Sequence, residues 1–340
     1  MRRCCCFLLS GAAFSMFAIS AAVAGDITLK VGPGALYHTI SAAVAVADSD
    51  ANPADFYVIE VAPGTYTNDF SAVTRPMMLE VNPAKIGRAV ILKATVPLPN
   101  EKGIILANAD LTVNGLTFEG AEIANDLGGN GAGIRDQNLS TPATLIVENS
   151  SFINNQEGIL TGYNSAQSIS IINTTFKNNG NPNQSYFQHA LYVNYAGSLS
   201  VSSSTFCGQL IGHDIKSRAM MTTISDNQLY DGQADPALGC RSGSSSLAID
   251  LPNGGIATIA GNAITQGAAS QNDKMVDYGE EGLLYSANSL LVSDSSFTNI
   301  GANPATAIYD PYCVPVQLAG NTFTNISTVV DPSICAISTN

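Results

Sequence analysis

The chain has 340 residues, of which 45% are apolar and only 12% are charged, and its 27 Asp and Glu residues against 14 Lys and Arg give a net charge of -13. This composition excludes a disordered chain, which would be less apolar, and a long coiled coil, which would be far richer in charged residues. The negative charge also argues against nucleic acid as a partner, because nucleic-acid binding requires neutralisation of phosphates. Any anionic ligand must therefore be held by a local group of basic residues.

Residues 1–24 have the pattern of a cleavable secretory signal peptide. Two arginines precede an apolar stretch over residues 4–22, and residues 22–24 form a small-residue cleavage site. The alternative, an uncleaved membrane anchor, is disfavoured because serines and a glycine dilute the apolar stretch. We therefore expect a secreted or periplasmic protein that is not embedded in a membrane after cleavage. We expect the remainder, residues 25–340, to form a single domain and a monomer.

The segment after the signal peptide predicts a cap. Residues 36–47 read LYHTISAAVAVA, an amphipathic helix whose start Thr39 or Ser41 would assist. The segment that follows, residues 57–66, reads as a strand ending in a Pro-Gly turn. We assign the N-terminal cap to residues 25–66, because the open end of a solenoid exposes strand edges and apolar core.

The main signal is an internal repeat. An apolar-x-apolar pair, a polar turn and then a large apolar residue recur eight times between residues 111 and 326. The segments are short, alternate with period two and are bounded by Asn, Ser and Gly, so each repeat predicts a coil of short strands rather than helices. Stacked coils place equivalent residues in ladders about 4.8 Å apart. The instances are Leu111/Val113/Phe118, Leu145/Val147/Phe152, Ile169/Ile171/Phe176, Leu199/Val201/Phe206, Thr222/Ile224/Leu229, Ala257/Ile259/Ile264, Leu290/Val292/Phe297 and Val316/Leu318/Phe323.

The sequence predicts an all-β parallel β-helix, a solenoid of about 8 to 10 coils with an N-terminal capping helix. We assign the coils to residues 67–326 and a C-terminal cap to residues 327–340. The cap helix, the stretch Ile59-x-Val61-x-Pro63-Gly64-x-Tyr66 and the coils resemble the right-handed parallel β-helix group of the pectate-lyase-like superfamily. That group includes polysaccharide lyases, glycoside hydrolases, epimerases, esterases and adhesins. The resemblance therefore implies a right-handed fold and a polysaccharide partner, and it leaves the activity open.

Four cysteines follow the predicted signal peptide. An even number of cysteines in an exported protein favours disulfides. Of the three possible connectivities, we favour Cys207–Cys240 and Cys313–Cys335.

A further strand of each coil carries the candidate site. If the apolar residues Leu191, Ile215, Ile249, Val276 and Ile308 face inward, alternation places a polar row outward. We expect Asn194, Asp214 and Arg218 on the same face. The row itself consists of Tyr192, Lys216, Asp250, Asp277 and Tyr309.

This row fits β-elimination on a uronic-acid polymer. Arg218 would neutralise the substrate carboxylate, Lys216 would remove the C5 proton, and Tyr192, His213 or His189 would supply an acid. Asp250, stacked on Lys216, would raise the pKa of that lysine and oppose its role as a base. We therefore predict an exported lyase of acidic polysaccharides, with two sets of site residues. The catalytic set is Lys216, Arg218, Tyr192, His213 and Asp250, and the substrate-binding set is His189, Asn194, Asp214, Asp277, Tyr278 and Tyr309.

Three alternatives stay open at this point. Asp250 and Asp277 are paired carboxylates of the kind that glycoside hydrolysis requires. Together with Asp214 they are also candidate oxygen ligands for Ca²⁺, the one cofactor that the sequence suggests. In the third alternative the row is a charge ladder on a non-catalytic glycan-binding or adhesin-like protein.

Overall fold

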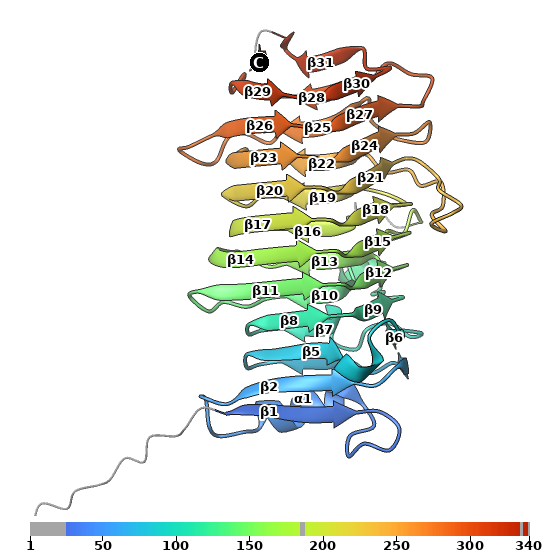
Figure 1. The fold of residues 1–340 in the computed structure, drawn as a ribbon, viewed down its shortest axis with the longest axis vertical. Coiled ribbons are helices and arrows are strands. Elements are labelled where there is room, and N and C mark those ends of the chain that lie inside the picture. Colours follow the sequence, from blue (N-terminus) through green and yellow to red (C-terminus); the bar gives the residue numbers. More distant parts are fainter. Residues whose placement is uncertain (1–24, 184–187, 334–335, 339–340) are drawn as a thin grey trace, which may run out of the picture.

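The computed structural model describes residues 25–183, 188–333 and 336–338. The predicted signal peptide, residues 1–24, lies outside the described residues. The described chain winds into an elongated right-handed parallel β-helix whose coils stack from β1 at one end to β31 at the other (Figure 1). Three parallel sheets run along this stack, and we number them in the order in which the chain visits them.

The first sheet contains 12 strands within the described residues. They are β1 (Asp26–Val31), β2 (Phe56–Val61), β5 (Met77–Val81), β8 (Leu111–Asn114), β11 (Ala143–Glu148), β14 (Asn164–Ile172), β17 (Ala196–Ser202), β20 (Met221–Ser225), β23 (Ile256–Ala260), β26 (Ser289–Ser293), β29 (Val316–Ala319) and β32 (Ala336–Ser338).

The second sheet contains 10 described strands. They are β3 (Gly64–Thr67), β6 (Val90–Lys93), β9 (Leu116–Glu119), β12 (Ser151–Ile153), β15 (Thr175–Lys177), β18 (Thr205–Cys207), β21 (Gln228–Asp231), β24 (Ala263–Gln266), β27 (Ser296–Asn299) and β30 (Thr322–Thr324). Two short 3-10 helices, η1 (Pro83–Lys85) and η2 (Asn125–Leu127), lie in the connections.

The third sheet also contains 10 described strands, and it positions the candidate site. They are β4 (Ser71–Val73), β7 (Gly103–Ala107), β10 (Ala132–Asp136), β13 (Glu157–Thr161), β16 (Leu191–Val193), β19 (His213–Ser217), β22 (Leu247–Leu251), β25 (Lys274–Tyr278), β28 (Thr306–Tyr309) and β31 (Thr328–Asp331).

The predicted repeat register is confirmed. In the first sheet Leu111 pairs with Leu145, Leu145 with Ile169, and the series continues coil by coil to Val316. The large apolar residues form the matching series in the second sheet, from Phe118 to Phe323. The repeat thus specifies both which strands pair and which residues meet.

Stacked phenylalanines fill much of the interior beneath the second sheet. The rings of Phe118 and Phe152 lie 5.0 Å apart, those of Phe152 and Phe176 lie 5.0 Å apart, and those of Phe176 and Phe206 lie 4.5 Å apart. All four side chains are buried. Aromatic pairs at this separation stabilise the fold beyond the burial of their area, by about 0.5–1.5 kcal/mol per pair.

The helix α1 (Ile40–Asp48) lies beside the first coils, against β1, β2 and β4 (Figure 1). It begins later than the predicted range because Thr39 is the N-cap, accepting a hydrogen bond from the Ala42 amide. The Asp69 carboxylate accepts hydrogen bonds from the amides of Ile40 and Ser41. A carboxylate at this end stabilises a helix because the first amides have no partners within it.

The two ranges that we assigned to caps also contain strands of the solenoid. Residues 25–66 contain β1, β2 and all of β3 except Thr67, which pair within the first two sheets, and residues 327–340 contain β31 and β32, which extend the third and first sheets. The solenoid thus continues into both ranges, because short strands there pair with the neighbouring coil although they fall outside the strict repeat.

Within the described residues, no helix has the length and apolar character needed to span a membrane.

The predicted disulfide between Cys207 and Cys240 is confirmed, and it joins residues 33 positions apart. Cys335, the predicted partner of Cys313, lies outside the described residues, so that pairing stays a prediction.

Candidate functional site

The predicted polar row is in register on the third sheet. Tyr192 pairs with Lys216, Lys216 with Asp250, Asp250 with Asp277, and Asp277 with Tyr309. Five successive coils, β16 to β28, therefore bring residues that are far apart in the sequence into one line along the solenoid.

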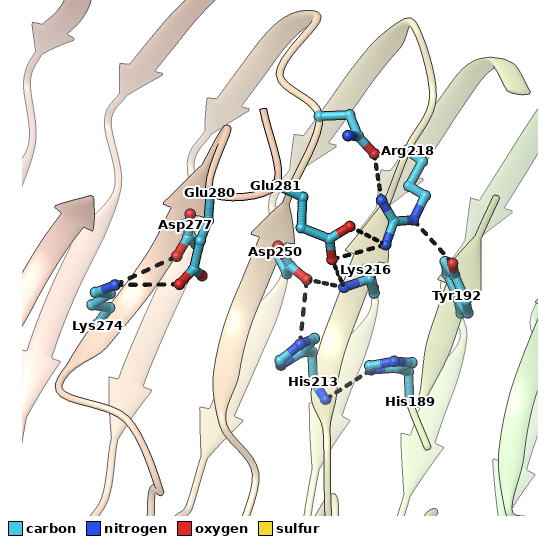
Figure 2. Close-up of polar contacts among 11 residues, drawn as sticks. His189, Tyr192, His213, Lys216, Arg218, Asp250, Lys274, Asp277, Glu280 and Glu281 are labelled. Carbon is cyan, nitrogen blue, oxygen red and sulfur yellow. Dashed lines mark hydrogen bonds and ion pairs between the residues drawn. The ribbon is translucent and has the colours of Figure 1, made fainter. Parts of the chain in front are cut away.

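Lys216 lies at the centre of a charged cluster (Figure 2). Its Nζ is 2.6 Å from Oδ2 of Asp250 and 3.2 Å from Oε1 of Glu281. Glu281 also contacts Arg218, whose Nη2 is 2.7 Å from Oε2 of the glutamate. One glutamate carboxylate therefore bridges both cations.

Arg218 is held by three further groups. Its Nε donates to the hydroxyl oxygen of Tyr192 at 3.0 Å, and its Nη1 donates to the side-chain oxygen of Asn253. Its guanidinium carbon lies 5.9 Å from the centre of the Tyr192 ring and 5.7 Å from that of Tyr195. The planar fork of an arginine donates in fixed directions, so these contacts aim its Nη2 at Glu281.

The cluster is buried except for Glu281. The side chains of Lys216 and Asp250 are 10% and 5% exposed, whereas that of Glu281 is 46% exposed. Glu281 lies between Gly279 and Gly282, which both adopt positive φ angles of 89° and 101°. These left-handed positions favour glycine, and they turn the loop so that the glutamate lies over the two cations.

Burial disfavours the charged form of Lys216, but the adjacent Asp250 and Glu281 carboxylates outweigh it and raise the pKa of this lysine. Lys216 is therefore a permanent cation at neutral pH. The raised pKa argues against the predicted role of Lys216 as the base, because a base must be neutral before it can accept a proton. The bridging Glu281 has a lowered pKa, because hydrogen bonds from Arg218 and the charge of Lys216 outweigh its partial burial.

His213 and His189 stack at the edge of the cluster, with ring centres 4.7 Å apart. Nε2 of His213 lies 3.3 Å from Oδ2 of Asp250, and Nδ1 of His189 accepts a hydrogen bond from the His213 amide. Burial and the Lys216 charge lower the pKa of His213 to about 3, and burial also lowers the pKa of His189. Both imidazoles are therefore neutral at neutral pH, which argues against the predicted role of either as a proton donor.

A second group of charges lies one coil further along. Lys274 Nζ is 3.8 Å from Oδ2 of Asp277 and 3.9 Å from Oε1 of Glu280, and it lies 3.4 Å from the centre of the Tyr309 ring. Burial, followed by the contact with Glu280, raises the pKa of Asp277 to about 8. Asp277 is therefore largely protonated at neutral pH.

Asp277, whose side chain is 0% exposed, and three further predicted substrate-binding residues are placed differently from expectation. Asp214 is fully buried, Tyr278 is fully buried with its hydroxyl donating to the Gly255 carbonyl, and His189 is buried with its amide donating to Glu157. These side chains are inaccessible to a polymer, so their assignment to substrate binding is corrected. The side-chain oxygen of Asn194 accepts a hydrogen bond from the Tyr195 amide.

The prediction that Asp214 faces outward is wrong because the alternation of side chains breaks in β19. In β19 both Asp214 and Ile215 are fully buried, and the adjacent coil repeats this at Ala248 and Ile249. Strict alternation therefore breaks at this point of the third sheet, and Asp214 joins a buried column instead of the outer row. Burial and the nearby Asp231 raise the pKa of its carboxyl group.

The residues do not fit the calcium site that the sequence suggested. Asp214 is enclosed away from the outer row, and Oδ2 of Asp250 is already bound by Lys216. The part of the chain that the structure describes holds no group of three or more His, Cys, Asp or Glu residues that is able to hold a metal ion.

Two contributors were missed by the sequence reasoning. Glu281 and Asn253 lie in loops that follow β25 and β22, and they reach the cations across the coils. The only sequence signal was the pair of Gly-containing strings, Asp250–Gly255 and Asp277–Gly282, that follow the row.

Comparison with known proteins adds little to this picture. No family model and no curated protein matches the chain. Among solved structures, the chain is similar to the PL6 family alginate lyase AlyGC, with 13% sequence identity and a TM-score of 0.45. The match covers 92% of this chain and 38% of that protein. The pairing of the strands by itself defines the protein as a parallel β-helix.

Proposed function

We propose that this protein binds an acidic extracellular polysaccharide and cleaves it by β-elimination at the cluster around Arg218. The observation that supports this most directly is the bridging carboxylate of Glu281, which contacts both Lys216 and Arg218. Two cations that together hold one half-exposed carboxylate form a site with the right chemistry for the carboxylate of a uronic acid.

The charge distribution of the chain supports the same interpretation. A protein with only 14 basic residues and a net charge of -13 has a lysine and an arginine two positions apart, Lys216 in the row and Arg218 directly after β19. The general field repels a polyanion, so the local pair must supply the attraction. In this proposal the substrate carboxylate replaces that of Glu281.

The reaction requires a proton to leave C5 and the C4–O bond to break. Arg218 and Lys216 bind the uronate carboxylate and stabilise the negative charge that develops on it as the C5 proton leaves. The C5–H electron pair becomes the C4–C5 double bond, and the bond from C4 to the leaving oxygen breaks.

Tyr192 is our candidate for the proton transfer. Its hydroxyl oxygen accepts a hydrogen bond from Arg218, so it lies beside the cation that binds the substrate carboxylate in this proposal. In the proposal the Tyr192 oxygen takes the C5 proton while its own hydroxyl proton passes to the leaving oxygen, so the residue ends the reaction in the form in which it began. Asp250 is assigned to positioning, because its carboxylate fixes Lys216 and lies against His213.

A glycoside hydrolase is the second candidate. The raised pKa of Asp277, about 8, is what a general acid requires at neutral pH, and the Asp250 carboxyl group lies on the adjacent coil. Against it, the Asp277 side chain is 0% exposed and Asp250 is paired with Lys216.

Export of the protein is part of the proposal, and the Cys207–Cys240 disulfide supports it because such bonds persist in oxidising compartments.

The test is a panel of uronic-acid polymers with two readouts. Ultraviolet absorbance detects the unsaturated product of a lyase, and a reducing-end assay alone detects a hydrolase. We expect both signals together from at least one polymer, and reducing ends without the unsaturated product would move the assignment to Asp277 and Asp250. Binding without either signal would identify a non-catalytic glycan-binding protein.

Variants assign the roles. We expect Tyr192→Phe to lower kcat at least about 100-fold, which is the usual contribution of a positioned acid or base, while substrate binding is retained. Tyr230→Phe, on the second sheet, is the matched control. Full activity of a folded Tyr192→Phe variant would refute the role of Tyr192.

A further inference from the structure

A row of aromatic side chains leads to the charged cluster along one corner of the solenoid. Tyr163 lies between β13 and β14, and Tyr195 lies at the same place one coil later, between β16 and β17. The pairing of Asn164 with Ala196 fixes this correspondence, and the Asn164 amide donates to the Tyr195 carbonyl.

The rings continue the stack onto Arg218. The centres of the Tyr163 and Tyr195 rings lie 5.7 Å apart with a tilt of 59°, and the Arg218 guanidinium lies 5.7 Å from the Tyr195 ring. Three successive coils therefore present a tyrosine, a tyrosine and an arginine in line. The hydroxyl of Tyr285, in the connection between β25 and β26, donates a hydrogen bond to the Arg218 carbonyl, so this connection also contacts the same corner.

The end of the row that is furthest from the cluster is open. Tyr163 is 62% exposed, which is unusual for a large aromatic side chain, whereas Tyr195 is half-buried between its two neighbours. Neither ring is needed to fill the interior, where the phenylalanine stack lies. Exposed aromatic rings in line with a binding site commonly serve recognition, because they contribute a large rigid surface at a small cost in conformational entropy.

We propose that Tyr163 and Tyr195 form a saccharide subsite in which the apolar faces of sugar rings pack on the tyrosines, while the next uronate along the chain binds Arg218 and Lys216. The inference rests on the proposed function and adds to it a direction, with the polymer lying along the solenoid axis. Coils about 4.8 Å apart repeat the tyrosine at a spacing suited to consecutive units of an extended polymer. The occupant is the same acidic polysaccharide, because the row ends at the carboxylate-binding cations.

The experiment measures affinity and turnover separately. Binding of a uronate oligosaccharide series is titrated against the wild type, Tyr163→Ala, Tyr163→Phe and Tyr195→Leu, and product formation is recorded in parallel. We expect Tyr163→Ala and Tyr195→Leu to weaken binding about 3- to 10-fold and to raise KM, and for Tyr163→Ala we expect an unchanged kcat. Tyr163→Phe keeps the ring and should bind as the wild type does. The Tyr163→Ala and Tyr195→Leu substitutions should weaken the binding of longer oligosaccharides more than that of a disaccharide.

The controls separate the two proposals. Tyr230→Ala, on the second sheet, removes a tyrosine away from the row and should leave binding unchanged. Equal affinity of all variants for the longer oligosaccharides would overturn the subsite, whatever the activity. Tyrosine-dependent binding without unsaturated product would retain the subsite and refute the lyase assignment, and absence of any binding by the wild type would overturn both.

Discussion

The bridging carboxylate of Glu281 makes the sharpest prediction. If it occupies the position of a substrate carboxylate, then it competes with substrate, and replacing it with Gln should increase affinity. The change removes one negative charge from Lys216 and Arg218 while keeping the shape of the side chain.

The size of the expected increase in affinity follows from the exposure of the Glu281 side chain. Glu281 is 46% exposed, so its ion pairs are screened by water and each is worth about 0.2–1 kcal/mol. Since 1.4 kcal/mol corresponds to a tenfold change in affinity, Glu281→Gln should bind a uronate oligosaccharide about 2- to 5-fold more tightly than the wild type. The loss of folding stability should stay below about 1 kcal/mol for the same reason.

The assay is a titration with the same oligosaccharide at low and at high salt. Glu280→Gln is the matched control, because it removes an equal charge from the same loop but contacts Lys274 rather than the two site cations. If Glu281→Gln binds no better than Glu280→Gln, then Glu281 is no stand-in for the substrate, and the carboxylate site that supports the proposed function loses its main argument. The difference between the variants should shrink at high salt.

Three further predictions concern stability. Lys216→Met leaves the Asp250 carboxylate, which is 5% exposed, without its cation, and we expect the free energy of unfolding in urea to fall by about 3 kcal/mol; an unchanged value would show that the pair is not buried in solution. Asp277 has a pKa of about 8 in the folded protein, so between about pH 4 and pH 8 it holds a proton that the unfolded chain has released. The free energy of unfolding therefore falls as pH rises through this window, and Asp277→Asn should make it less dependent on pH. Melting temperatures that fall equally with pH in the wild type and in Asp277→Asn would contradict the raised pKa. The Cys207–Cys240 bond closes a separation of 33 residues, so Cys207→Ser with Cys240→Ser should lower the free energy of unfolding by about 3–4 kcal/mol; a difference below about 1 kcal/mol would show that the bond constrains the unfolded chain little.

The sequence by itself determined the architecture. The period-two pairs and the large apolar residues recur in one register, and only stacked parallel coils bury all of them at once. The same alignment placed Tyr192, Lys216 and Asp250 in one line, because strand pairing moves whole rows together. It also favoured the Cys207–Cys240 bond that the structure contains.

Only the tertiary structure decided what the row can do. The loop that carries Glu281 lies outside the repeat, so no periodicity predicts that its carboxylate bridges Lys216 and Arg218. Burial of Asp214 beside Ile215 breaks the alternation on which its assignment depended. The sequence predicted that Asp250 stacks on Lys216 and raises its pKa, but the 2.6 Å contact and the burial of both side chains come from the tertiary structure, and the strength of the interaction depends on them.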